Sequence, residues 1–273
     1  MPELPEVETI CQELKPKLQF RKIVKVVKFR DKIRNYLPPN IELNIVNKEI
    51  LDIKRQAKYI IITLKPYGFL VFHLGMTGKL ITKSSNVNIL KHDHFVLYLS
   101  NELILTFNDA RRFGIIDYFD NYIELTKKYF TNIGVEPLLP DFNSIYLLKK
   151  ISCKQIAIKK LLMDNNIVVG IGNIYAAEVL FKCNISPFKL GKDISKTEAD
   201  NIVKYSKIIL QKAIELNGSS FRDYVLTSGE KGGFQNHFYV YGRYDEQCKI
   251  CASHITKATQ SGRTTFYCPT CQK

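Results

Sequence analysis

Two pairs of cysteines near the end of the chain have the spacing of a metal site. The C-x2-C-x16-C-x2-C pattern comprises Cys248, Cys251, Cys268 and Cys271. Two thiolates separated by two residues reach one ion from a tight turn, and a second pair on a hairpin completes a tetrahedral shell. We expect one structural Zn²⁺, because four thiolates leave no open coordination position, with a disulfide pair as the alternative. The other cysteines, Cys11, Cys153 and Cys183, are expected to be small buried hydrophobic residues.

The first residues of the chain offer a different chemistry. Removal of the initiator methionine before Pro2 would expose a secondary amine. An α-amine has a pKa of about 8, well below that of lysine, so part of it is neutral and nucleophilic near neutral pH. Its attack on an aldehyde-like sugar carbon gives an iminium ion, which enables elimination, and Glu3 and Glu6 could transfer protons. The alternative is a plain helix start with proline in the first turn.

The charge of the chain favours a polyanionic partner. Lysine and arginine total 40 against 26 aspartate and glutamate residues, a formal net charge of +14. A basic surface gains affinity for nucleic acid by releasing counterions from the phosphates. The alternative is the lysine-rich composition of an AT-biased genome, since isoleucine and asparagine are abundant too.

The length and composition predict a globular protein. The 273 residues suffice for two domains, and 45% of them are hydrophobic. No apolar run approaches the roughly 18 residues of a membrane-spanning helix. The start, MPELPEVETI, lacks a basic region followed by an apolar core, so no secretory signal is expected. We therefore expect a soluble intracellular protein.

Apolar periodicity changes along the chain. Residues 3–20 are predicted to form a helix, because apolar residues recur near every 3.6 positions. Residues 21–120 contain short β-branched and aromatic runs separated by Pro, Gly and Asn, which is typical of an antiparallel sandwich or barrel. The segment 131–140 carries Gly134, Pro137 and Pro140 and is predicted to be a connector.

After about residue 141 the pattern becomes helical. Helices are expected at 142–150, 154–164, 173–182, 195–217 and 219–226. The long helix begins with Ser195 and Glu198 in the spacing of a capping box. Residues 227–240 are rich in glycine and polar side chains, so a mobile loop is expected, and residues 241–273 should place two strands around the ion. The predicted fold class is α+β, with several domains.

Seven motifs occur in an order that resembles one enzyme family. They are MPELPEVET at the start, RQAKY at 55–59, HLGMTG at 73–78, KHDH at 91–94, DARRFG at 109–114, GIGNIYAAEVLF at 170–181 and the four-cysteine ribbon. Together they resemble the bacterial formamidopyrimidine-DNA glycosylase family over essentially the whole chain. Its members remove oxidised purines, such as 8-oxoguanine and formamidopyrimidines, from duplex DNA in base excision repair and then cut the strand. One departure is Ala110, where relatives often have Pro or Val, and it should alter only loop stiffness.

The resemblance implies a fold and its partners. An N-terminal helix and a catalytic antiparallel β-sandwich domain would span 1–133. A helical domain with a helix–two-turn–helix element that binds DNA would span 134–240, and a zinc-ribbon β-hairpin 241–273. The family also implies damaged double-stranded DNA as partner, one structural Zn²⁺ ion, a monomer without an obligate protein partner, and a bacterial cytoplasmic location at the nucleoid during repair.

The resemblance also assigns catalytic roles. By similarity, Pro2 attacks the anomeric carbon of the damaged nucleotide, the base leaves, and the imine undergoes β- and then δ-elimination. Glu3 resembles the general acid/base that protonates the sugar ring oxygen, and Glu6 a supporting carboxylate. Lys58 stands at the place of a lysine that assists β-elimination and holds a phosphate. Arg263 stands at the place of an arginine that grips phosphates and assists δ-elimination.

DNA-contacting residues follow from the same motifs. The target base must leave the stack before an amine can reach its sugar, which leaves a hole in the duplex. Met76, Arg111 and Phe113 match the residues that fill this hole, with Arg111 facing the widowed cytosine. Further DNA contacts are implied for Lys154 at the start of a helix, Asn173 at a helix N-terminus, His73, His92 and Tyr241. The loop 227–240 matches the segment that closes over the everted base.

Plainer interpretations of these residues stay open. Met76 and Phe113 could be core residues, Asn173 an N-cap, and the two histidines structural. A sister enzyme, an endonuclease VIII-type glycosylase for oxidised pyrimidines, shares the N-terminal proline, the helix–two-turn–helix and the zinc hairpin, although Leu4 together with Met76, Arg111 and Phe113 favours the purine branch. A non-enzymatic DNA-binding module is a third possibility, but a pure binder has no need of Pro2 followed by Glu3.

Overall fold

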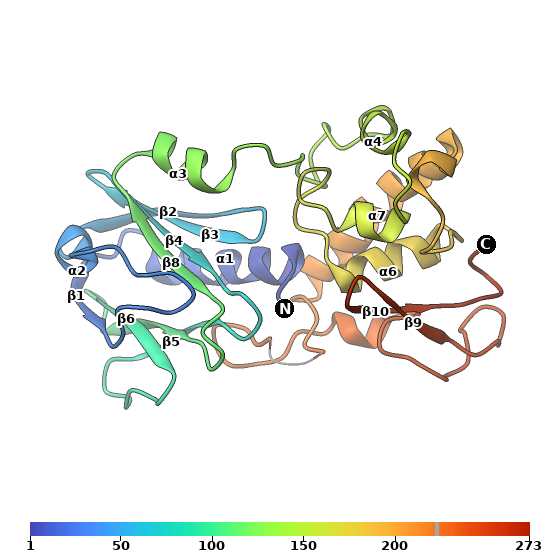
Figure 1. Ribbon diagram of the computed structural model, residues 1–273. Helices are drawn as coiled ribbons and strands as arrows, with labels where there is room; N and C mark the ends of the chain where they lie inside the picture. Colours follow the sequence, from blue (N-terminus) through green and yellow to red (C-terminus); the bar gives the residue numbers. More distant parts are fainter. Residues whose placement is uncertain (222–223) are drawn as a thin grey trace. The chain divides into compact units, whose positions relative to one another are not determined.

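The chain divides into two units. A computed structural model describes residues 1–221 and 224–273 (Figure 1). Unit 1 comprises Met1–Thr131 and Leu216–Gly233, and unit 2 comprises Asn132–Glu215 and Phe234–Lys273. Among the helices of the described residues, none is both long enough and apolar enough to cross a membrane.

Two four-stranded antiparallel sheets form the centre of unit 1. The strand orders are β1-β6-β7-β5 and β2-β3-β4-β8. The strands are β1 (Ile23–Lys28), β2 (Glu49–Gln56), β3 (Tyr59–Lys65), β4 (Phe69–His73), β5 (Lys79–Ser84), β6 (Asp93–Leu99), β7 (Leu103–Asn108) and β8 (Ile115–Phe119). The prediction of antiparallel strands over 21–120 is therefore confirmed.

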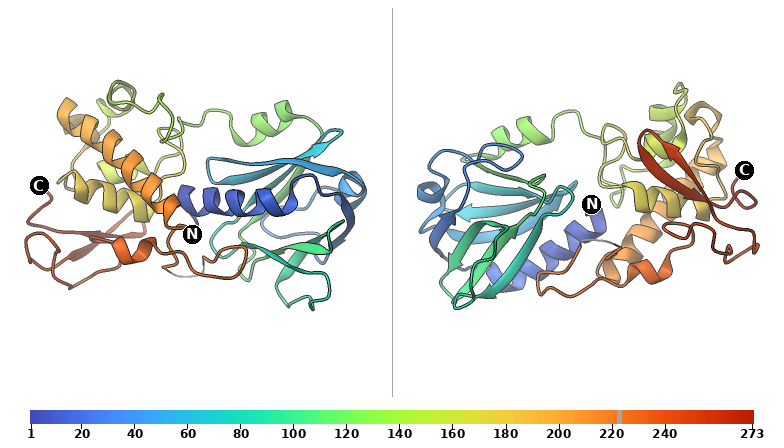
Figure 2. Two further views of the ribbon diagram at one scale, coloured as in Figure 1. Left: turned by 180° about the vertical axis from the view of Figure 1, so that it is seen from behind. Right: turned by 60° about the horizontal axis from the view of Figure 1, so that its bottom comes forward.

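Aromatic side chains join the two sheets into one core. The ring centroid of Phe72 in β4 lies 5.9 Å from that of Phe107 in β7 and 6.3 Å from that of Phe95 in β6. Helix α1 (Leu4–Leu18) adds its apolar stripe to this core and lies alongside the sheets in both views of Figure 2. Two helices that were not predicted, α2 (Ile41–Ile45) and α3 (Tyr122–Tyr129), complete unit 1.

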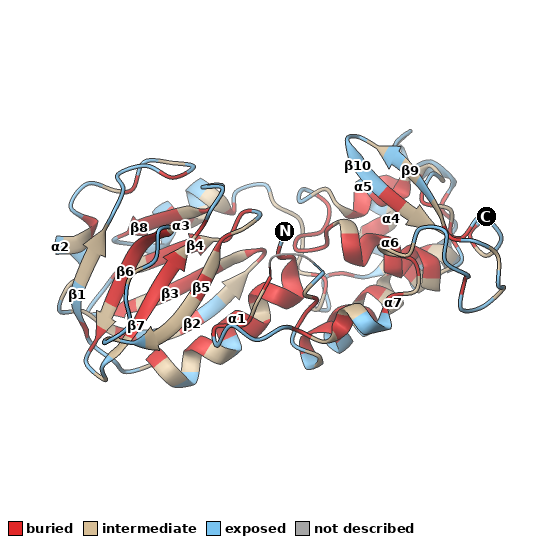
Figure 3. Cartoon of the chain, turned by 90° about the horizontal axis from the view of Figure 1, so that it is seen from below, coloured by how far each residue is buried: buried red, intermediate tan, exposed pale blue. Residues whose placement is uncertain are grey.

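Unit 2 combines helices with a two-stranded hairpin. Its elements are α4 (Ser144–Ile151), α5 (Ile158–Leu162), α6 (Asn173–Lys182), α7 (Lys196–Glu215), the 3₁₀ turns η1 (Gly191–Asp193) and η2 (Phe234–His237), and strands β9 (Thr256–Gln260) and β10 (Arg263–Tyr267). Figure 3 shows α6 buried along most of its length and the hairpin partly exposed. Ala177 and Phe181 of α6 share an apolar cluster with Ile255 and Cys268, so the cysteine-rich segment packs on this helix.

Two helix predictions are corrected by backbone hydrogen bonds. The helix expected at 154–164 begins only at Ile158, whose N–H donates to the Lys189 carbonyl at 2.7 Å, while the Gly191 N–H donates to the Ile156 carbonyl at 2.9 Å. Extended pairing therefore takes the place of the first helical turn, and Lys154 lies before the helix.

The helix expected at 219–226 is wrong over its described residues, 219–221 and 224–226, which are irregular. Arg222 and Asp223 lie outside the described part of the chain. The prediction for the scattered cysteines is wrong for Cys153, which is exposed, whereas Cys11 is buried and Cys183 half-buried.

The capping box of α7 is confirmed. The Ser195 hydroxyl accepts the Glu198 N–H at 3.2 Å, and the Glu198 carboxylate accepts the Ser195 N–H at 2.9 Å. These reciprocal bonds satisfy two backbone donors at the helix start.

We expect Ser195→Ala to lower the free energy of unfolding by about 1 kcal/mol, because one of these donors loses its acceptor. Urea denaturation followed by far-ultraviolet circular dichroism measures this. Ser195→Thr keeps the hydroxyl and should retain most of the stability, so equal losses in both variants would contradict the capping explanation.

Candidate functional site

The N-terminal residues are buried at the start of α1. Glu3 is the N-cap of this helix and is only 2% exposed, and Pro2 is also buried. Met1 is 49% exposed. Pro5 occupies the first turn, where its missing N–H costs no helical hydrogen bond.

The carboxylate of Glu6 ties this end of α1 to a distant segment. One oxygen accepts the Glu3 N–H at 2.8 Å, and the other accepts the Ser219 N–H at 2.8 Å and the Ser219 hydroxyl at 3.0 Å. Gly218 has a φ of +72°, and a Cβ there would lie 3.0 Å from the Glu6 side chain. The sequence did not identify Ser219, because it is 213 positions away from Glu6 and belongs to no motif.

Lys58 lies in the tight turn between β2 and β3. Gln56 and Tyr59 face each other across this turn, and Ala57 has a φ of +52°. Arg55 fixes the turn, because it donates to the Ala57 carbonyl at 3.0 Å and to the Glu8 carboxylate of α1 at 2.8 Å. Lys58 is itself 9% exposed.

His73, at the end of β4, is held as a neutral imidazole. Burial lowers its pKa to about 4, and the nearby charges of Lys58 and Arg34 act in the same direction. Its Nδ1 accepts the Gly75 N–H at 3.0 Å, so Nε2 carries the proton and is a donor. Lys58 and His73, from two separate motifs, are thus brought close together.

Met76, Arg111 and Phe113 lie on two adjoining loops of unit 1. Met76 is 36% and Phe113 43% exposed, so neither is a core residue. The guanidinium carbon of Arg111 lies 4.7 Å from the centroid of the Phe113 ring. Arg111 is exposed. His92 is half-buried and lies beside the same loop, because its backbone carbonyl accepts the Asp109 N–H at 3.0 Å. Flexible, cationic and aromatic side chains are therefore presented together.

Asn173 is the first residue of α6, and Gly172 rather than Asn173 is the N-cap. The Asn173 amide oxygen accepts the Lys159 ammonium at 2.6 Å. Its amide nitrogen donates to the Thr264 carbonyl at 2.9 Å and lies 3.4 Å from the Tyr241 hydroxyl. Asn173 therefore links α6 to the hairpin.

Two buried charged residues of unit 2 were not predicted from the sequence. Lys159, 2% exposed, donates to Asn173 and also to the Thr265 hydroxyl of β10 at 2.7 Å. Glu178 accepts three consecutive backbone N–H groups, from Tyr239, Val240 and Tyr241, at 2.8–3.0 Å. Burial raises the pKa of Glu178, and these donors oppose the rise. A lone glutamate inside the apolar run NIYAAEVLF was the available signal.

Arg263 is exposed at the start of β10, opposite Gln260, and a two-residue turn joins the strands. Lys154 is half-buried between α4 and α5, where its carbonyl accepts the Lys192 N–H at 3.1 Å. Both side chains lie in unit 2, together with Asn173 and Tyr241.

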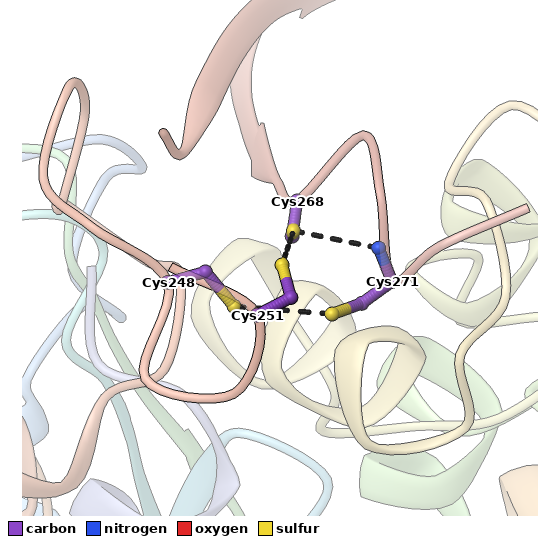
Figure 4. Close-up of side chains that lie close together, drawn as sticks. All are labelled: Cys248, Cys251, Cys268 and Cys271. Carbon is purple, nitrogen blue, oxygen red and sulfur yellow. Dashed lines mark hydrogen bonds between the residues drawn. The ribbon is translucent and has the colours of Figure 1, made fainter. Parts of the chain in front are cut away.

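The four cysteines of the ribbon converge on one point (Figure 4). Their sulfur atoms all lie within 4.8 Å of one another, with Cys248 Sγ to Cys271 Sγ at 3.9 Å and Cys251 Sγ to Cys268 Sγ at 3.4 Å. A tetrahedral zinc with bonds of about 2.3 Å separates its sulfurs by about 3.8 Å, so the donor set fits this ion. Hydrogen bonds from Ser253 lower the pKa of Cys251 to about 6, whereas burial raises the pKa of Cys268 and of Cys271.

Family models match three consecutive parts of the chain. The formamidopyrimidine-DNA glycosylase N-terminal domain matches residues 1–116, and the formamidopyrimidine-DNA glycosylase H2TH domain matches residues 133–225. The zinc finger found in FPG and IleRS matches residues 245–273. Together these models cover most of the sequence.

Full-length relatives agree with these matches. A formamidopyrimidine-DNA glycosylase of Rickettsia bellii is 44% identical over 273 residues and 100% of both chains. A Lactococcus lactis FPG mutant in complex with Fapy-dG-containing DNA has a TM-score of 0.92 and 32% identity over 100% of both chains. Lactococcus lactis Fpg with abasic-site DNA has a TM-score of 0.92 and 32% identity over 99% of both chains. The chain therefore belongs to the formamidopyrimidine-DNA glycosylase family, the DNA glycosylases of base excision repair.

Proposed function

We propose that this protein is a bifunctional DNA glycosylase and AP lyase that removes oxidised purines from duplex DNA through an imine on Pro2. The observation that carries the proposal is the buried start of α1, where Pro2 and Glu3 stand side by side and Glu6 fixes the backbone between them. A disordered N-terminus could not hold an amine against a sugar carbon, whereas a fixed one supplies the required orientation.

The first steps use the residues at this end of α1. With Met1 removed, the Pro2 nitrogen attacks C1′ of the damaged nucleotide, a C–N bond forms, and the N-glycosidic bond breaks. Glu3 protonates the ring oxygen as the sugar opens. The resulting iminium acidifies C2′–H, so β-elimination and then δ-elimination expel the two phosphates. Glu6 holds the backbone in position through its bonds to Glu3 and Ser219.

Cationic and polar donors are proposed to hold the DNA backbone. Lys58 would bind a phosphate and assist β-elimination, and His73 would offer its Nε2–H as a neutral donor. In unit 2, Arg263, Asn173 and Lys154 would contact phosphates, with Tyr241 and His92 as further contacts. The net charge of +14 supports this interpretation.

Met76, Arg111 and Phe113 are proposed to enter the duplex where the damaged base has left. Apolar and aromatic side chains replace the lost stacking, and Arg111 donates to the acceptor edge of the opposite cytosine. Their exposure in unit 1 supports this role, because a side chain that enters the duplex must be accessible to it.

One structural Zn²⁺ is proposed for the four cysteines. Its chemistry would be structural, since four thiolates complete its shell, and it would fix the hairpin that carries Arg263.

We also propose the division into domains at 1–133, 134–240 and 241–273, a lid function for residues 227–240, a monomeric state without an obligate protein partner, and a cytoplasmic location at the nucleoid during repair.

Borohydride trapping tests the Pro2 chemistry. On a duplex with 8-oxoguanine opposite cytosine, we expect a covalent protein–DNA adduct, because borohydride reduces the imine. Pro2→Gly should retain DNA affinity and lose most of its turnover. Pro39→Gly, at an exposed proline, is the control and should trap like the parent protein. If active protein forms no adduct, the lyase assignment is removed. Oxidised pyrimidines in the same assay test the alternative specificity, that of an endonuclease VIII-type glycosylase.

Metal analysis tests the zinc proposal. We expect one zinc per chain, and Cys268→Ser should lose it, unfold the hairpin and weaken DNA binding, because zinc contributes about 10–16 kcal/mol in isolated zinc-finger peptides. Cys153→Ser, at an exposed cysteine outside the cluster, should keep the metal. Full DNA affinity of a zinc-free protein would contradict this role.

The low pKa of His73 predicts a pH-dependent stability. Between pH 6.5 and 4 the unfolded chain binds a proton at this residue that the folded chain does not, so stability falls as the pH falls. At pH 4 this loss should be about 3 kcal/mol and absent in His73→Gln. Urea denaturation at several pH values measures it, with exposed His237→Gln as control. Parallel pH profiles for the parent protein and His73→Gln would refute the neutral state of His73 in the folded protein.

A further inference from the structure

The loops that carry Met76 and Arg111 meet at one buried carboxylate. Asp109 follows β7 and is fully buried. Its Oδ1 accepts the Thr77 hydroxyl at 2.5 Å, and its Oδ2 accepts the Gly114 N–H at 2.8 Å. Thr77 follows Met76 directly, and Gly114 follows Phe113 directly. The Asp109 side chain therefore holds the residue that follows Met76 and the residue that follows Phe113.

The Thr77 hydroxyl extends the connection to Arg111. While its hydrogen goes to Asp109, its oxygen accepts the Arg111 N–H at 3.2 Å. The backbone of Arg111 is thus fixed by a chain of two hydrogen bonds that ends on the buried carboxylate.

The backbone of Asp109 binds the KHDH segment. Its N–H donates to the His92 carbonyl at 3.0 Å, and its carbonyl accepts Nε2–H of His94 at 2.8 Å. His94 is only 3% exposed. Asp109 therefore joins three sequence motifs at one buried point.

Close packing removes the remaining freedom between the loops. Gly75 has a φ of +59°, and a Cβ there would lie 2.4 Å from the carbonyl oxygen of Phe113. The backbone segments that carry the exposed side chains of Met76 and Phe113 are therefore closely packed against each other.

We propose that Asp109, acting through Thr77, is the positioning residue that presets Met76, Arg111 and Phe113 and so sets the discrimination for the base opposite the lesion. This inference rests on the proposed function of those three residues. Arg111 distinguishes cytosine from other bases only if its donors meet the base edge in a fixed geometry. A mobile backbone would let it adapt to other bases, so anchoring converts the contact into specificity.

The test compares variants at Thr77, because Thr77→Val keeps the shape of the side chain and removes only the hydroxyl. The quantity to be measured is the single-turnover rate of 8-oxoguanine excision opposite cytosine and opposite adenine. Thr77→Val should lower the cytosine-to-adenine rate ratio about three- to tenfold, the value of one hydrogen bond. Cleavage of a preformed abasic site in single-stranded DNA, where no opposite base exists, should stay unchanged.

Two further variants serve as controls. Thr77→Ser restores the hydroxyl and should restore the ratio. Thr106→Val removes a buried hydroxyl of β7 that has no hydrogen-bond partner in the described part of the chain, so it should behave like the parent protein. A change in the ratio that Thr106→Val reproduces would indicate general loosening and overturn the proposal.

Asp109→Asn supplies an independent measurement. The amide places a donor against either the Thr77 hydroxyl or the Gly114 N–H, so the rate ratio should fall in the same direction. The parent protein could excise 8-oxoguanine while Thr77→Val and Asp109→Asn keep its cytosine-to-adenine rate ratio. This result would reject the positioning role of Asp109 and leave the proposed function standing. A parent protein that does not excise the base would overturn the proposed function and this inference together.

Discussion

The contact between Glu6 and Ser219 is the constraint on which the proposed chemistry depends. A carboxyl group that is 1% exposed needs hydrogen-bond donors, and here they come from Glu3 and from a segment that follows α7 in the sequence. Because one donor is the backbone of Glu3, satisfying this buried group also fixes the residue next to Pro2. The cost of burying a carboxyl is thereby coupled to the placement of the proposed nucleophile.

Unit 2 uses buried charge in a similar way. Glu178 collects three consecutive backbone donors from the segment that leads into the ribbon, and Lys159 joins α5 to Asn173 and Thr265. Each of these groups would be strongly destabilising without its partners. The arrangement of helix and hairpin is therefore specified by polar contacts as well as by the apolar cluster around Phe181.

In both units, exposed residues are the proposed DNA contacts, and buried polar residues hold the backbone. The proposed DNA-contacting side chains Met76, Phe113 and Arg263 are exposed, whereas Asp109 in unit 1 and Glu178 and Lys159 in unit 2 are buried. A surface residue gains precision only when its backbone is held, and buried hydrogen bonds hold it more firmly than solvent-exposed ones. The local geometry of each set is thus built into the folded chain.

The sequence by itself determined the elements and the chemistry that depends on local spacing. Periodicity predicts α1, α6 and α7, alternation predicts the strands of the sandwich, and the C-x2-C pairs predict the four-sulfur cluster, since all of these depend on neighbours in the chain. The motifs, through their resemblance to a family, also indicated the candidate residues.

Only the tertiary structure decided which partners hold these candidate residues. Ser219 stands 213 residues from Glu6, and the extended pairing that delays α5 joins residues about 30 positions apart. Such contacts depend on how distant segments pack, and no local propensity encodes them.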